Sequence, residues 1–145
     1  MRRTLWLLVL LSSLSCDGTA FEPRERDYSL IEATAEGLVY AMSRDTLDGG
    51  WVRGPPIGGV SVRVEGVPID PSNPLSSRWF SLGGGRTDSD GHFSVTYEVR
   101  CGNYRRFRLL ATKAGYLDVA GNGLSCKEPQ YNELSMYSDG AFGAP

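Results

Sequence analysis

Hydrophobic residues that alternate one by one with polar residues constrain this chain more than any other feature of its sequence. Residues 60–65 read VSVRVE, so three valines point to one side of an extended strand and three polar residues to the other. Residues 92–99 (HFSVTYEV) and 105–113 (RRFRLLATK) repeat this pattern. A period of two predicts strands with one buried and one solvated face, as in antiparallel sheets.

Shorter segments predict the remaining strands. We expect these at residues 38–42, 51–52, 78–82, 116–120 and 131–137, separated by turn-forming residues. Residues 67–77 contain three prolines and predict a long loop, and residues 83–85 (GGG) predict a flexible hinge. No window of ten residues has the period of an amphipathic helix. About seven short strands predict an all-β fold, a single antiparallel β-sandwich.

The first sixteen residues predict export. Arg2 and Arg3 precede an apolar run, residues 5–11, and a small-residue exit ends at Cys16. This is the layout of a secretory signal peptide, because the apolar run is too short to span a bilayer. A cysteine at the exit also resembles the bacterial lipoprotein signal, in which that cysteine is lipidated, so Cys16 is the candidate lipidation residue. The alternative is ordinary cleavage after residues 18–20, which discards Cys16 and releases a soluble protein.

About 125 to 130 residues remain after the signal, enough for one domain. We expect a signal peptide at 1–16, a tether at 17–35, the sandwich at 36–138 and a flexible tail at 139–145. Without the two signal arginines the chain has 13 basic and 17 acidic residues, a net charge of −4. A chain with this balance lacks the excess of basic residues that is typical of nucleic-acid-binding proteins. The expected location is the bacterial cell envelope, with a lipid anchor to the membrane facing away from the cytoplasm, or else the secreted space.

Two cysteines, Cys101 and Cys126, remain wherever the signal is cut. An even number in an oxidising compartment predicts that they form a disulfide. A zinc or thiol-redox role is disfavoured, because the pair has no C-x-x-C spacing and no histidine companions.

Four segments resemble a known family when taken in order: residues 37–39 (GLV), 56–62 (PIGGVSV), 87–93 (TDSDGHF) and 111–116 (ATKAGY). Together they are similar to the carboxypeptidase regulatory-like domain, a transthyretin-like β-sandwich common in bacterial envelope proteins. The resemblance spans about residues 37 to 120. It implies a transthyretin-like or Ig-like sandwich without catalysis, because the peptidase activity resides in a separate zinc domain that is absent here.

The segment DSDG predicts a hairpin turn at Asp88, Asp90 and Gly91. Aspartate side chains accept backbone N–H groups in such turns, and glycine adopts the positive φ that the turn requires. A calcium loop of the EF-hand type is the alternative, but it needs a glutamate twelve positions from the first aspartate, where Val99 stands. We therefore predict a turn and no metal site.

The chain has a single histidine, His92, so we predict no catalytic residues and no cofactor. The 5-hydroxyisourate hydrolases and intradiol dioxygenases, which also use transthyretin-like sandwiches, rely on more than one histidine. His92 follows the predicted turn and points opposite to Phe93, hence toward solvent.

Binding is the better supported class. Trp51, Trp79 and Tyr104 are the candidate ligand contacts, together with Tyr131 and Tyr137, because they lie near turns and candidate edge strands. The alternative is that these aromatic residues cover the core.

One basic cluster accompanies these aromatic residues. Arg106 and Arg108 share a strand face that suits anionic polymer or lipid headgroups, or is simply solvated. The leading hypothesis is a structural or protein-interaction module with an envelope protein as partner. The alternative is a carbohydrate-binding module for envelope or environmental glycans.

Overall fold

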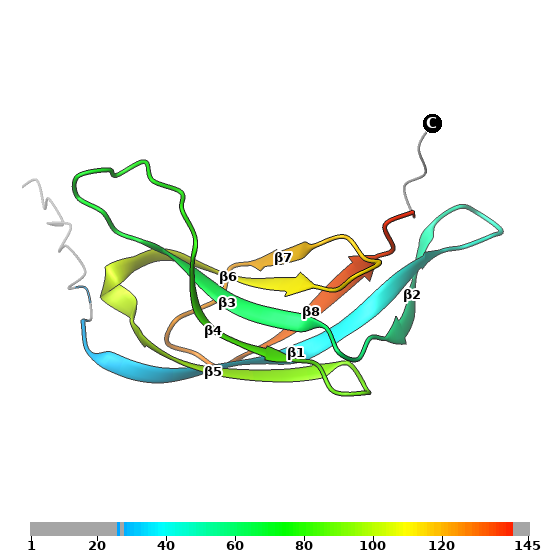
Figure 1. Cartoon of the computed structure of the whole chain (residues 1–145), viewed down its shortest axis with the longest axis horizontal. Helices are drawn as coiled ribbons and strands as arrows, with labels where there is room; N and C mark the ends of the chain where they lie inside the picture. The colour runs from blue at the N-terminus through cyan, green and yellow to red at the C-terminus, as the bar shows by residue number, and fades with distance from the viewer. Residues whose placement is uncertain (1–25, 27, 141–145) are drawn as a thin grey trace, which may run out of the picture.

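Two β-sheets pack face to face in the computed structural model, which describes residue 26 and residues 28–140 (Figure 1). The signal peptide and Cys16 lie outside the described residues. The described part forms eight strands and one 3-10 turn, Cys101–Asn103. The strands are β1 (Leu30–Arg44), β2 (Trp51–Pro56), β3 (Ser61–Pro68), β4 (Phe80–Arg86), β5 (His92–Arg100), β6 (Tyr104–Thr112), β7 (Val119–Asn122) and β8 (Gln130–Tyr137). The predicted β-sandwich is confirmed, with eight strands where about seven were expected.

Sheet A is built around β1, the longest strand. The first part of β1 pairs with β5 in antiparallel register, from Leu30 opposite Arg100 to Leu38 opposite His92. Residues 40–44 of β1 pair with β2. Residues 35–42 pair with β8, so this ladder overlaps both of the others along β1. The β1–β8 ladder is parallel, so the sheet is not purely antiparallel. Strand β1 is therefore the element that holds sheet A together.

Sheet B has the order β4-β3-β6-β7, with antiparallel pairs throughout. The β3–β6 register shifts between Val67 and Pro68, because Val67 lies opposite Arg106 whereas Pro68 lies opposite Tyr104. Arg105 is the extra residue of a β-bulge at this point. In Figure 1 the loop between β3 and β4 rises beyond the end of the sandwich, at the upper left.

The core lies between the inner faces of the two sheets. Strand β5 shows the alternation most clearly, since Phe93, Val95, Tyr97 and Val99 are buried and the residues between them are exposed. The other buried apolar residues of this cluster are Ala35, Val39, Ile57, Val60, Val62, Val64, Phe107, Leu109, Ala111, Leu134 and Met136. Burial of the Tyr97 ring raises the pKa of its hydroxyl above the ordinary value.

Two expectations from the sequence are wrong. The expected tether, 17–35, overlaps β1, which begins at Leu30. The predicted glycine hinge, 83–85, lies inside β4 and pairs with β3. A Cβ atom on Gly83 would lie 2.9 Å from the Cβ atom of Tyr97. Glycine is therefore needed there because β4 passes close to β5 of the other sheet, not because the chain bends.

Candidate functional site

The hairpin turn at residues 88–91 has the predicted construction. The Asp88 carboxylate accepts hydrogen bonds from the backbone N–H groups of Asp90 and His92, each at 2.9 Å. Gly91 has φ of 79°, and a Cβ atom there would lie 2.5 Å from the carbonyl oxygen of Val39. Asp90 contributes its backbone N–H to the turn, and the residue is exposed. In the part of the chain that the structure describes, no group of three or more His, Cys, Asp or Glu side chains forms a metal site.

Thr87, which the sequence analysis did not single out, joins this turn to the segment before β3. It is 6% exposed, and its hydroxyl donates to the carbonyl of Ile57 at 2.8 Å while accepting from the N–H of Val60 at 2.9 Å. Its backbone N–H donates to the carbonyl of Val60, and its carbonyl accepts from Gly59. Two of the motifs quoted above are thus in direct contact through one side chain.

Cys101 and Cys126 form the predicted disulfide, with their Cα atoms 5.8 Å apart. Both cysteines are partly buried and pack against the core cluster. The bond ties the turn between β5 and β6 to the segment before β8. It acts as a structural link at one end of the sandwich.

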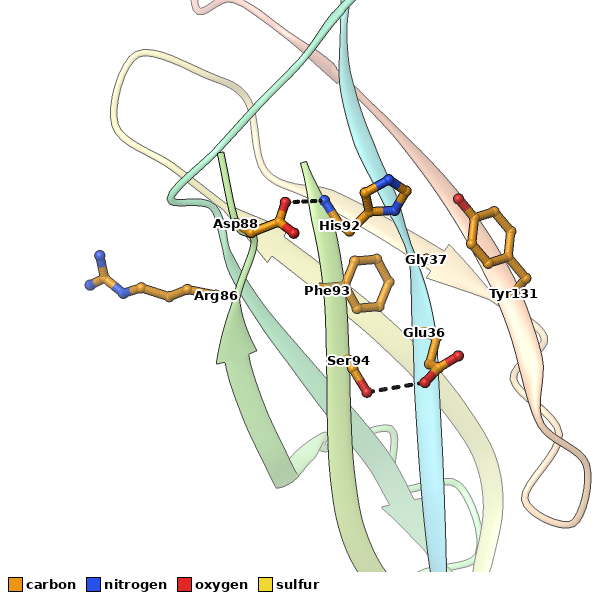
Figure 2. Close-up of a pocket in the computed structure, with 8 residues that line it drawn as sticks. All are labelled: Glu36, Gly37, Arg86, Asp88, His92, Phe93, Ser94 and Tyr131. Carbon is orange, nitrogen blue, oxygen red and sulfur yellow. Dashed lines mark hydrogen bonds between the residues drawn. The ribbon is translucent and has the colours of Figure 1, made fainter. Parts of the chain in front are cut away.

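A shallow cavity of about 330 Å³ surrounds His92. Figure 2 shows the imidazole on the side of the sheet that carries Tyr131, and Arg86 directed away from the other labelled residues. The Ser94 hydroxyl lies 3.3 Å from the Glu36 carboxylate, and Asp88 contacts the backbone N–H of His92 rather than its ring. Among the described residues of this cavity, no hydrogen-bonded chain runs from a nucleophile through the His92 ring to a carboxylate, as a Ser-His-Asp triad requires.

Trp51 belongs to a cluster on the outer face of sheet A. Its ring packs edge-on against Tyr137, with 4.7 Å between centroids and 89° between planes, and the guanidinium of Arg44 lies 5.6 Å from its centroid. Nearby, Arg53 lies 4.1 Å from the ring centroid of Tyr40 and forms an ion pair with Glu133 at 3.1 Å. We call Tyr40, Arg44, Trp51, Arg53, Glu133 and Tyr137 the Trp51 cluster.

Trp79 lies on the outer face of sheet B. The guanidinium of Arg108 is 4.2 Å from its ring centroid and that of Arg106 is 5.7 Å away. Arg108 also forms an ion pair with the buried Glu65, at 2.7 Å. A cavity of about 490 Å³, which we call the Trp79 pocket, opens beside the ring, and its lining residues are Trp79, Arg105, Arg106, Phe107, Asn122, Gly123 and Leu124.

The β3–β4 loop, which leads to Trp79, folds back against the 3-10 turn and the start of β6. Arg105 donates to the carbonyl of Pro74, and the N–H of Ile69 donates to the carbonyl of Asn103 at 2.8 Å. Within the loop, the Asp70 carboxylate accepts a hydrogen bond from the Ser72 hydroxyl and another from the Ser72 backbone N–H. These bonds lower the pKa of Asp70, the hydroxyl having the larger effect. The first two contacts hold the start and the middle of the loop against the 3-10 turn and Arg105 of β6.

The remaining candidate aromatics have different surroundings. Tyr104 is half-buried, packs against the core cluster and lies 5.5 Å from Phe107 between ring centroids. Tyr131 is 62% exposed on β8. Trp51 and Trp79 are on the outer faces of opposite sheets, so the structure does not bring the three candidate contacts into one site. The pairing of Arg108 with Glu65 was not foreseen, because it depends on the β3–β6 register.

No protein-family model matches the chain, and no curated protein matches it. Three solved structures are similar at 14% identity: a type II cohesin–X-dockerin complex from Acetivibrio cellulolyticus, the shaft pilin spaA from Lactobacillus rhamnosus GG, and 3-chlorocatechol 1,2-dioxygenase from Rhodococcus opacus 1CP. Their TM-scores are 0.42, 0.45 and 0.43, and the matches cover 73%, 75% and 77% of this chain.

This chain spans 58%, 50% and 61% of those three chains. At these similarities none of the three indicates what this chain binds or catalyses. Within the described residues, no helix is long and apolar enough to cross a membrane.

Proposed function

We propose that this chain is an exported, non-catalytic β-sandwich that is anchored by lipid on Cys16 and binds an envelope protein through the Trp51 cluster. The resemblance to the carboxypeptidase regulatory-like domain belongs to the same proposal. The contact between residues 57–60 and Thr87 supports it, since it connects two of the motifs that carry the resemblance.

The composition of the Trp51 cluster is the observation that carries the proposal. Tryptophan, tyrosine and arginine are the residues most enriched at the energetic centres of protein interfaces. Here two tyrosines, one tryptophan and two arginines meet on one outer sheet face, and their mutual contacts fix their side chains before any partner arrives. Such preorganisation lowers the entropy lost on binding.

The carbohydrate-binding alternative is less well supported on this face. A flat glycan platform needs aromatic rings that lie in one plane, whereas Trp51 and Tyr137 are perpendicular. The proposed partner is therefore a protein.

Site-specific photo-crosslinking in the cell of origin tests the proposed interface. A crosslinker replacing Tyr131, on the same outer face, should capture one protein, and one replacing Arg63, exposed on the outer face of sheet B, should not. The Trp51→Ala, Tyr137→Ala double variant should lose the capture, since a central hot-spot residue contributes about 2 kcal/mol or more. Equal capture from both faces, or capture unaffected by the double variant, would refute the interface.

The anchor has a separate test. Replacing Cys16 with Ser should move the protein from the membrane fraction to the soluble fraction, because the acyl chains attach to that sulfur. Unchanged partitioning would show that Cys16 is not lipidated.

A further inference from the structure

The β-bulge in β6 sets two arginines side by side at the rim of the Trp79 pocket. Arg105 is the extra residue of the bulge, and Arg106 lies opposite Val67. A bulge turns neighbouring side chains toward the same side of a strand, whereas a regular strand would turn them to opposite faces. Both arginines are exposed and line the pocket.

The charge of these two arginines is not neutralised within the described residues. Arg108, which does not line the pocket, is ion-paired with Glu65. Arg105 contacts a backbone carbonyl and Arg106 contacts the ring of Trp79, and neither forms an ion pair with a described carboxylate. Among the described residues, the pocket therefore has two uncompensated guanidinium groups, in a chain whose net charge is −2. The positive charge at the pocket favours an anionic ligand.

The rest of the pocket wall is more apolar than the wall of a site for a simple ion. Trp79, Phe107 and Leu124 supply apolar surface, and Asn122 supplies an amide that both donates and accepts hydrogen bonds. The volume of about 490 Å³ is within the range of small-molecule sites and far exceeds the needs of a single inorganic anion.

We propose that the Trp79 pocket binds an acidic sugar, that is, a sugar ring bearing a carboxylate. The carboxylate pairs with the guanidinium groups of Arg105 and Arg106, which offer planar two-pronged donors. The C–H face of the sugar packs on Trp79, and its hydroxyls bond to Asn122. This site is independent of the Trp51 cluster and lies on the opposite sheet.

Calorimetric titration of the full processed protein with tri-galacturonic acid tests this proposal. Binding should be measurable, and the methyl-esterified trisaccharide, which has the same rings without the charge, should bind at least about tenfold more weakly, as expected when a charged hydrogen bond is lost. Trp79→Ala and Arg106→Gln should each reduce affinity by about tenfold or more. Arg106→Lys should recover only part of it, since lysine lacks the planar fork.

Matched controls separate this site from the other proposal. Arg63→Gln removes an exposed arginine from the same sheet face outside the pocket, and Trp51→Ala removes the other outer-face tryptophan, so both should leave sugar affinity unchanged. Equal binding of the acid and its ester, or full binding by Trp79→Ala, would overturn the proposal. So would competition by inorganic phosphate at the same concentration, which would indicate a general anion site.

Discussion

Replacing Thr87 with Val should destabilise the protein far more than the small change in side-chain volume suggests. Valine has nearly the same shape as threonine, so the substitution leaves no cavity, but it removes the hydroxyl that serves both Ile57 and Val60. Each buried backbone group left without a partner costs about 1–3 kcal/mol, so the free energy of unfolding should fall by about 2–6 kcal/mol. That is a large share of the roughly 5–15 kcal/mol available to a domain.

Urea denaturation followed by circular dichroism measures this effect. With a slope of about 2 kcal/mol per molar urea, the midpoint should fall by about 1–3 M. Thr87→Ser keeps the hydroxyl and should lose only about 1 kcal/mol, for one buried methyl group. Thr96→Val, at an exposed position whose hydroxyl is hydrogen-bonded to the Thr34 hydroxyl, should lose less than about 1 kcal/mol. The hydroxyl does not hold these segments together if the free energy of unfolding of Thr87→Val lies within about 1 kcal/mol of the parent's. The same conclusion follows if Thr87→Ser is destabilised as much as Thr87→Val.

Three further changes test other parts of the structure. Removing the disulfide with Cys101→Ser and Cys126→Ser opens a loop with sequence separation 25 and should cost about 3–4 kcal/mol; an unchanged thermal midpoint would contradict this. Gly37→Ala would place a Cβ atom 1.8 Å from the carbonyl oxygen of Asn132, so strand β8 must shift, and amide exchange along β8 should accelerate; unchanged protection would contradict it. Because burial raises the pKa of Tyr97 above 10.0, the unfolded chain releases this proton first, and stability present below pH 10 is lost as pH rises through the folded pKa. Tyr97→Phe should therefore lose less stability between neutral and alkaline pH, and parallel pH profiles for the two proteins would refute this.

Strands with large inward residues were readily found from the sequence. Residues 60–65, 92–99 and 105–113 coincide with most of β3, β5 and β6, because their valine, phenylalanine and leucine side chains form a strong period of two. The first half of β1 was missed. Its inward positions hold Ala33, Ala35 and Gly37, which give almost no hydrophobic alternation, and Phe93 fills the space above Gly37. The small residues suit a strand that is paired along both edges and closely packed.

The sequence by itself determined the all-β class, the disulfide partners and the turn at residues 88–91. The class and the turn depend on residue type or on contacts within a few positions. The disulfide depends on the expectation that Cys16 is lipidated or removed, which leaves two cysteines and one way to pair them. Only the tertiary structure decided the parallel β1–β8 ladder, the arginine bulge beside Trp79 and the separation of Trp51 from Trp79 on opposite sheets. These features depend on strand register and sheet order, and pairings between distant segments are set by the packing of the whole core rather than by any local pattern.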